Sequence, residues 1–129
     1  METSINEAIE YYKMASEEDL KTAQTLFATR RYADCLFFCF LSIQRIFKAV
    51  VVKKTDEHIS LMATDMLLEL AEDAGITLSK EQEEDVIAIN SFDRFDFYTS
   101  DYYKRATKSY TQKYLLKTEQ LRSWLLKQL

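Results

Sequence analysis

Apolar side chains recur every three or four residues along most of the chain, a spacing that predicts α-helices. The first predicted helix spans residues 4–29. Ser4 followed by Glu7 has the pattern of a capping box at its start. Its apolar face comprises Ile5, Ile9, Tyr12, Ala15, Leu20, Ala23 and Phe27. A polar turn over residues 29–31 then leads into the next helix.

The second predicted helix spans residues 32–52 and is apolar around most of its circumference. A helix with little polar surface is typical of the centre of a bundle. The charged residues interrupting it are Asp34, Arg45 and Lys48, so we predict a buried core helix rather than a membrane span, which needs about 20 residues nearly free of charge. Residues 53–59 are the first predicted loop.

Three further helices complete the pattern. One spans residues 60–74, with Gly75 placed as its C-terminal cap. The next begins after Ser79, which forms a second capping box with Gln82 and leads toward Phe92 and Asp93. The last spans residues 102–129, with Ala106, Tyr110, Tyr114, Leu121, Trp124 and Leu125 facing inward.

The composition supports helices and argues against a sheet. The chain of 129 residues has one glycine and no proline, whereas the many turns of a sheet depend on both residue types. We see no repeat or linker. We therefore predict an all-α fold, an antiparallel up-and-down bundle of four to five helices, forming one domain over residues 1–129.

The cysteines and the N-terminal sequence indicate the cellular compartment in which the protein is expected. Cys35 and Cys39 lie four residues apart inside the central helix, and the sole histidine is His58, so neither a disulfide framework nor a zinc site can be assembled. No signal peptide is visible at the N-terminus. We expect two buried free thiols, a cytoplasmic protein, no membrane association and no metal or other cofactor.

Charge is distributed unevenly along the chain. The formal net charge is −4, but residues 100–129 carry seven basic residues against two acidic ones. A basic terminal helix is able to bind phosphates. It also commonly faces water and pairs with acidic neighbours in its own fold, and the acidic balance of the whole chain favours this second interpretation.

The order of several short phrases resembles the HEPN family of helical-bundle proteins, over nearly the whole chain. The first-helix phrase is similar to residues 16–23 (SEEDLKTA), and A-[IV]-E-K-x-x-K-A to residues 43–49 (IQRIFKA). Residues 65–71 (DMLLELA) before Gly75 are similar to H-D-L-L-x-L-A. The phrases that close the family pattern are similar to residues 89–93 (INSFD), 102–107 (YYKRAT) and 121–125 (LRSWL).

The chain departs from this family where RNA cleavage would occur. The resemblance implies that ribonuclease members carry R-x4-6-H, but after Arg94 the three allowed positions hold Thr99, Ser100 and Asp101. None of these side chains exchanges protons near neutral pH as an imidazole does. We therefore lean against an enzyme.

The segment around Arg94 is still the first choice for a functional patch. Its carboxylates are able to hold Mg²⁺, or to pair with Arg94 in an acidic helix terminus or loop, which is the interpretation we favour. Its aromatic side chains, Phe92 included, suit either base stacking or a dimer interface, the latter being favoured. The candidates for nucleotide or RNA binding, or for a dimer interface, are Asp93, Arg94, Asp96, Tyr98, Asp101, Tyr102, Tyr103, Lys104 and Arg105.

The resemblance implies a non-catalytic binding or accessory module of a toxin–antitoxin or defence system. It would form a homodimer and bind a nucleotide, RNA or a minimal nucleotidyltransferase. Two alternatives stay open. One is a divergent ribonuclease using Arg94 with Asp101 or Tyr103, and the other is a plain dimerisation or adaptor bundle.

Overall fold

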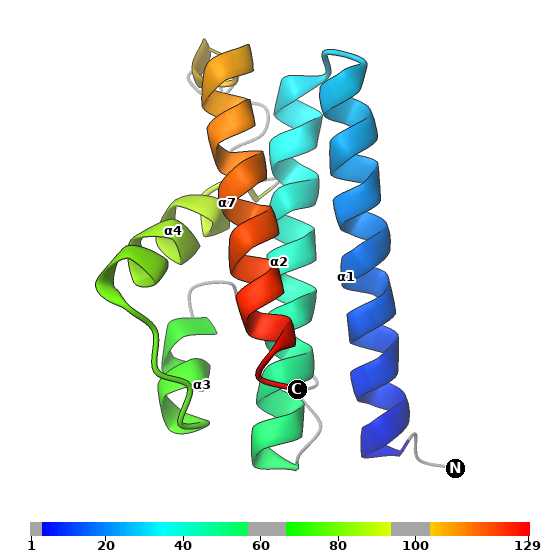
Figure 1. The fold of residues 1–129 in the computed structure, drawn as a ribbon, viewed down its shortest axis with the longest axis vertical. Helices are drawn as coiled ribbons and strands as arrows, with labels where there is room; N and C mark the ends of the chain where they lie inside the picture. The colour runs from blue at the N-terminus through cyan, green and yellow to red at the C-terminus, as the bar shows by residue number, and fades with distance from the viewer. Residues whose placement is uncertain (1–3, 57–66, 94–103) are drawn as a thin grey trace.

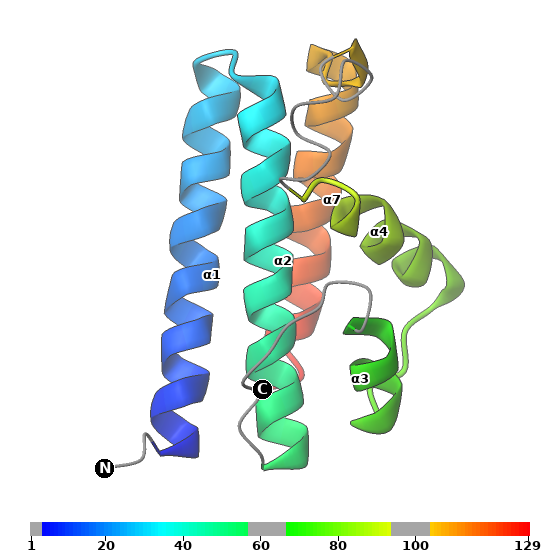
Figure 2. The same cartoon turned by 180° about the vertical axis from the view of Figure 1, so that it is seen from behind.

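The computed structural model describes residues 4–56, 67–93 and 104–129. These residues contain five α-helices, named α1 (Ile5–Ala28), α2 (Tyr32–Thr55), α3 (Leu67–Asp73), α4 (Lys80–Asn90) and α7 (Lys108–Leu126). They confirm the prediction of an all-α bundle. In Figures 1 and 2 the long helices α1, α2 and α7 lie side by side, with the short helices α3 and α4 beside α2 and α7.

The direction of the helices decides which segments share an end of the molecule. Helix α1 runs opposite to α2, and α7 runs in the same direction as α2 (Figure 1). The turn from α1 to α2 and the start of α7 therefore lie at one end of the bundle. The C-terminal ends of α2 and α7 lie at the other end.

Side-chain caps define the helix starts that the sequence predicts. The Ser4 hydroxyl accepts from the backbone N–H of Glu7 at 3.1 Å. At α4 both halves of the predicted capping box form, because Ser79 accepts from the Gln82 backbone N–H and donates its own N–H to the Gln82 side chain. These bonds satisfy N–H groups that have no partner within a helix.

Three described helices end in left-handed residues, among them α2, which ends at Asp56 with φ 55°. Gly75, at φ 77°, ends α3, with the Ile76 N–H bonded to the Ala71 carbonyl. Arg30 adopts the same conformation after α1, at φ 63°, and the Arg31 N–H bonds to the Leu26 carbonyl. Both are Schellman motifs, in which glycine is the usual residue at the left-handed position.

Three predicted boundaries were wrong. Helix α2 continues through residues 53–55, since Lys53 and Lys54 interact favourably with the negative end of the helix dipole. Helix α4 stops at Asn90 instead of reaching Asp93, because the N–H groups of residues 91 and 92 bond to carbonyls only three residues back. Helix α7 starts later than predicted, because Thr107 caps it by accepting from a backbone N–H. The predicted beginning of α3 lies outside the described residues.

Helix α2 is the centre of the core, as predicted. By length and composition it is apolar enough to cross a membrane, yet 67% of its most apolar window is buried inside this molecule. It packs on every other described helix. Its most completely buried large side chains are Leu36, Ile43, Ile46, Phe47, Val50 and Val52. The two cysteines of α2, Cys35 and Cys39, are buried free thiols, as expected. The pKa of Cys35 is raised by a hydrogen bond with Cys39 and by burial.

Candidate functional site

The α1–α2 turn and the segment before α7 meet at one end of the bundle (Figures 1 and 2). Ala106, from the segment before α7, lines a pocket of about 250 Å³ together with residues 30–34 of the turn and the start of α2. More than seventy residues of sequence separate these two segments. The fold thus joins two basic stretches that the sequence keeps apart.

Cations lie in the α1–α2 turn that lines this pocket and in the residues on either side of Ala106. Arg30, Lys104, Arg105 and Lys108 are exposed, and none of them forms an ion pair with any residue that the structure describes. Arg31 also lines the pocket but is paired with Asp34 at 2.6 Å. We call these five cations the basic end.

Two helix starts add to the positive potential here. Helices α2 and α7 both begin at the basic end, so the positive ends of both helix dipoles lie there. Arg105 lies close enough to Tyr110 to oppose the rise in that phenol's pKa, which burial and then Tyr114 produce. Free cations beside helix N-termini are suited to bind anions, phosphates in particular.

Phe92 lies in the core, not on the surface. Only 1% of it is exposed, and its ring meets those of Tyr110 and Tyr114 edge-on, at 6.1 Å and 5.3 Å between centroids. The prediction that it stacks bases or forms a dimer interface was therefore wrong. Its burial anchors the end of α4 to the first turns of α7.

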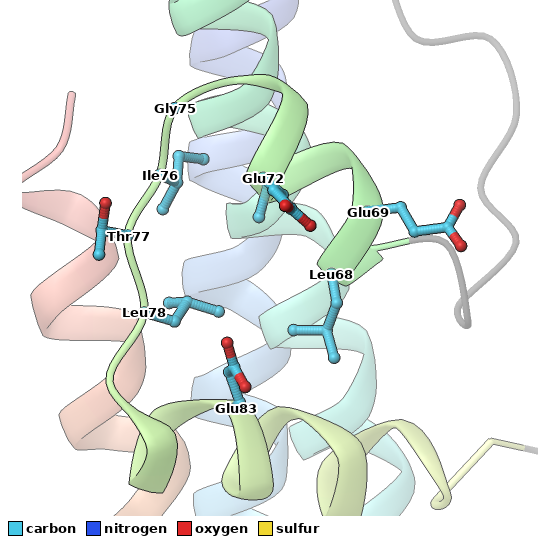
Figure 3. A pocket seen from close by; sticks show the side chains of 9 residues that line it. Leu68, Glu69, Glu72, Gly75, Ile76, Thr77, Leu78 and Glu83 are labelled. Atoms are coloured by element: carbon cyan, nitrogen blue, oxygen red, sulfur yellow. The ribbon is translucent and has the colours of Figure 1, made fainter.

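A second hollow has the opposite charge (Figure 3). It measures about 470 Å³ and lies between α3, α4 and the loop that joins them. Leu68, Ile76 and Leu78 supply apolar surface, and Glu69, Glu72 and Glu83 supply carboxylates. Such a pocket repels phosphate, so this hollow and the basic end differ in the ligands they favour.

The comparison with protein families identifies the bundle. A model of the HEPN domain matches residues 9–129, which is nearly the whole chain. The chain belongs to the HEPN domain family. The matched region includes the α1–α2 turn, the segment around Arg94 and all of α7. Neither the curated proteins nor the solved structures yield a match.

The predicted HEPN site residues fall partly within the described structure. Lys104 and Arg105 are exposed at the basic end, while Asp93 is half-buried next to Phe92. Among the described residues, no group of three potential metal-binding side chains exists. The candidates that lie outside the described residues are Arg94, Asp96, Tyr98, Asp101, Tyr102 and Tyr103; His58 also lies outside them.

The sequence interpretation missed a buried polar cluster in this HEPN bundle. Arg122 of α7 is only 9% exposed, and its Nε donates to the Ser16 hydroxyl at 2.9 Å. Ser16 donates to the Ser42 carbonyl at 2.8 Å, and Ser42 donates back to the Ser16 carbonyl at 2.9 Å. The sequence pattern did indicate that Arg122 is buried, because Arg122 continues the heptad-like spacing of Leu115, Thr118 and Leu125 on the buried face of α7.

A partly buried ion pair joins α1 and α2. Asp19 of α1 meets Arg45 of α2 at 3.0 Å. Burial raises the pKa of Asp19 above 3.8, and Arg45 only partly offsets this.

Two further cations interact within the fold. Lys48 lies over the Tyr12 ring at 5.4 Å, and the pKa of Lys48 is lowered by burial. Lys117 of α7 pairs with Asp85 of α4 at 2.9 Å, so this cation is used within the fold.

Proposed function

We propose that this HEPN-domain protein is an RNA-binding module that does not cleave its ligand. The observation that carries the proposal is a set of exposed cations at the start of α7, Lys104, Arg105 and Lys108, in a chain whose net charge is negative. None of the three forms an ion pair with a residue that the structure describes. Cations without carboxylate partners are available to phosphates, and phosphate contacts supply most of the affinity of sequence-independent RNA binding.

The lack of cleavage is inferred from the sequence after Arg94. The family ribonucleases need an imidazole within a short distance of their arginine, and Thr99, Ser100 and Asp101 stand at those positions. Without that general acid–base group, the phosphodiester would be bound but not broken.

The partners are proposed by analogy with the family. We place the protein as a homodimer, paired with a minimal nucleotidyltransferase in a toxin–antitoxin or defence system. The two buried free thiols support a reducing, cytoplasmic setting.

The binding test measures the fluorescence anisotropy of a labelled single-stranded RNA at several salt concentrations. The double variant Lys104→Ala/Arg105→Ala is compared with Lys54→Ala/Lys127→Ala, which removes the same charge at the far end of the bundle. We expect only the first variant to bind weakly. Because each lost phosphate contact on a single strand changes the log–log salt slope by about 0.7, its slope should be shallower by about 1.4.

A cleavage assay separates the alternatives. Wild type and Arg94→Ala are incubated with RNA and Mg²⁺, and we expect intact RNA in both. Cleavage that depends on Arg94 would establish a divergent ribonuclease instead. Absence of RNA and nucleotide binding by the wild type, even at low salt, would favour a plain adaptor bundle.

A further inference from the structure

The α1–α2 turn has no role in the proposal above, yet it faces the same pocket. Arg30 and Arg31 line that pocket opposite Ala106, whose neighbours in sequence include Arg105 and Lys108. The turn therefore supplies the cations that line this concave surface, and Ala106 brings the segment that carries Lys104, Arg105 and Lys108 to its edge. A phosphate chain that contacts Lys104 and Arg105 would meet the arginines of the turn next.

Arg30 occupies a position where its backbone is strained. It stands at φ 63° as the left-handed residue of a helix C-terminal motif, where glycine would be unstrained. No ion pair to a described residue offsets that strain. A strained residue whose charged side chain forms no ion pair with a described residue is a reason to look for a partner outside the fold.

The size of the pocket favours a strand over a free nucleotide. At about 250 Å³ it is smaller than the roughly 300–1,000 Å³ that sites for complete small molecules occupy. A pocket of this size accommodates one phosphate or one unit of a longer chain. The exposed cations around it would bind the phosphates on either side.

We propose that Arg30 and Arg31 form the second half of an RNA-binding site and bind successive phosphates of a single strand. The strand continues over Lys104, Arg105 and Lys108. This inference rests on the proposed function and specifies its ligand, an oligonucleotide rather than a mononucleotide. The pair Arg31–Asp34, at 2.6 Å, acts as a competitor, because the Asp34 carboxylate occupies a guanidinium that a phosphate would otherwise use.

The test uses Arg30→Gly, in which loss of charge is separated from loss of folding. The substitution relieves the left-handed strain, so thermal unfolding should occur at higher temperature while RNA binding weakens. We expect roughly a five- to tenfold loss of affinity at low salt and a salt slope shallower by about 0.7. Lys127→Ala, which removes one charge at the far end, should bind as the wild type does.

A second variant should act in the opposite direction. Asp34→Asn removes the competing carboxylate, and we expect roughly threefold tighter RNA binding, the scale of an exposed ion pair. Replacing the RNA probe by ATP or by inorganic pyrophosphate tests the ligand class. Both should bind far more weakly than the oligonucleotide does.

The outcomes separate this inference from the proposed function. If the wild type does not bind RNA, the proposed function fails and this inference fails with it. If Lys104→Ala/Arg105→Ala weakens binding but Arg30→Gly and Asp34→Asn both match the wild type, only the role of the turn is overturned. If ATP binds as tightly as RNA and responds to the same variants, the pocket holds a free nucleotide and the assignment of an RNA strand is wrong.

Discussion

Arg122 of α7 and Ser16 of α1 share a hydrogen bond of 2.9 Å between helices that lie far apart in sequence. Ser16 is itself bonded to Ser42 of α2, so one hydroxyl connects all three long helices. Arg122 has neutral partners, the Ser16 hydroxyl and, at 3.5 Å, the Lys13 carbonyl. Its pKa is lowered by burial, with Glu17 acting in the opposite direction.

Ser16→Ala should destabilise the bundle by about 2 kcal/mol, the scale for hydrogen bonds to charged groups. The substitution removes the acceptor of a nearly buried guanidinium, which is left with one long hydrogen bond. The measurement is urea denaturation followed by circular dichroism. An exposed control on the same helix is Glu10→Ala, which should change the free energy of unfolding by less than about 0.5 kcal/mol.

A double-mutant cycle that combines Ser16→Ala with Arg122→Met tests whether the loss of stability in Ser16→Ala comes from the Ser16–Arg122 hydrogen bond. Methionine fills similar space without a charge, so Ser16→Ala should then lose under about 1 kcal/mol, leaving a coupling energy near 1 kcal/mol. Additive losses would mean that Ser16 matters through the Ser42 pairing alone.

The stability of the protein should depend on pH through Asp19. Burial raises its folded-state pKa above 3.8, so the folded protein holds this proton more tightly than the unfolded chain does. The stability that this proton contributes is complete below the unfolded pKa and is lost as pH rises through the folded pKa. Relative to Asp19→Asn, the wild type should therefore become more stable as the pH falls from about 7 to about 4. The gain should be about 1.4 kcal/mol for each pH unit that separates the folded and unfolded pKa values of Asp19.

Comparing the two proteins at each pH cancels the titration of the other carboxylates. Urea denaturation of wild type and Asp19→Asn at matched pH values provides the measurement. A difference that moves the other way on acidification would mean that Arg45 lowers the pKa of Asp19 more than burial raises it.

Arg30→Gly should raise the free energy of unfolding by about 1 kcal/mol, because glycine adopts the left-handed conformation without strain. Arg30→Ala is the matched control. It removes the same charge but keeps a β-carbon, so its stability should stay near that of the wild type. An equal gain in both variants would attribute the effect to charge.

Gly75→Ala introduces the left-handed backbone strain that Arg30→Gly removes, so it should lower the free energy of unfolding. A β-carbon added at Gly75 would meet no atom within 4 Å, so only the backbone conformation at φ 77° opposes it. We expect a loss of about 1 kcal/mol. No loss would show that the end of α3 contributes little to the cooperative unfolding.

Thr118→Val should stabilise the bundle by about 1 kcal/mol. The Thr118 hydroxyl is fully buried and, within the described residues, has no hydrogen-bond partner, so an isosteric methyl group removes an uncompensated desolvation. Thr25→Val is the control, since that threonine is exposed and bonded to the Lys21 carbonyl. A loss of stability in Thr118→Val would reveal a partner for the hydroxyl.

The helix pattern and the caps could be predicted because they depend on neighbours in sequence. Ser4, Ser79 and Gly75 mark helix ends through local backbone bonds, and the structure places all three as predicted. The start of α7 was missed because Thr107 has no glutamate or glutamine three residues later to complete a capping box. The cap there is a single bond to the N–H of Tyr110.

The candidate site could be predicted only in part. Lys104 and Arg105 stood out because they lie in a basic segment. The contribution of Arg30 could not be found that way, since the turn gains its neighbours only when α1, α2 and α7 assemble. Arg122 was grouped with the solvent-facing cations, although its position in the apolar spacing placed it inside.

The segregation of charge gives the molecule a polarity that extends beyond contact distance. Cations of the turn and of the start of α7 lie at one end, while the carboxylates of α3 and α4 lie along one side. A polyanion approaching at low ionic strength would be repelled by much of this acidic protein and attracted to the basic end. The protein would consequently orient before the collision, and its association rate should fall steeply as added salt shortens the range of the field.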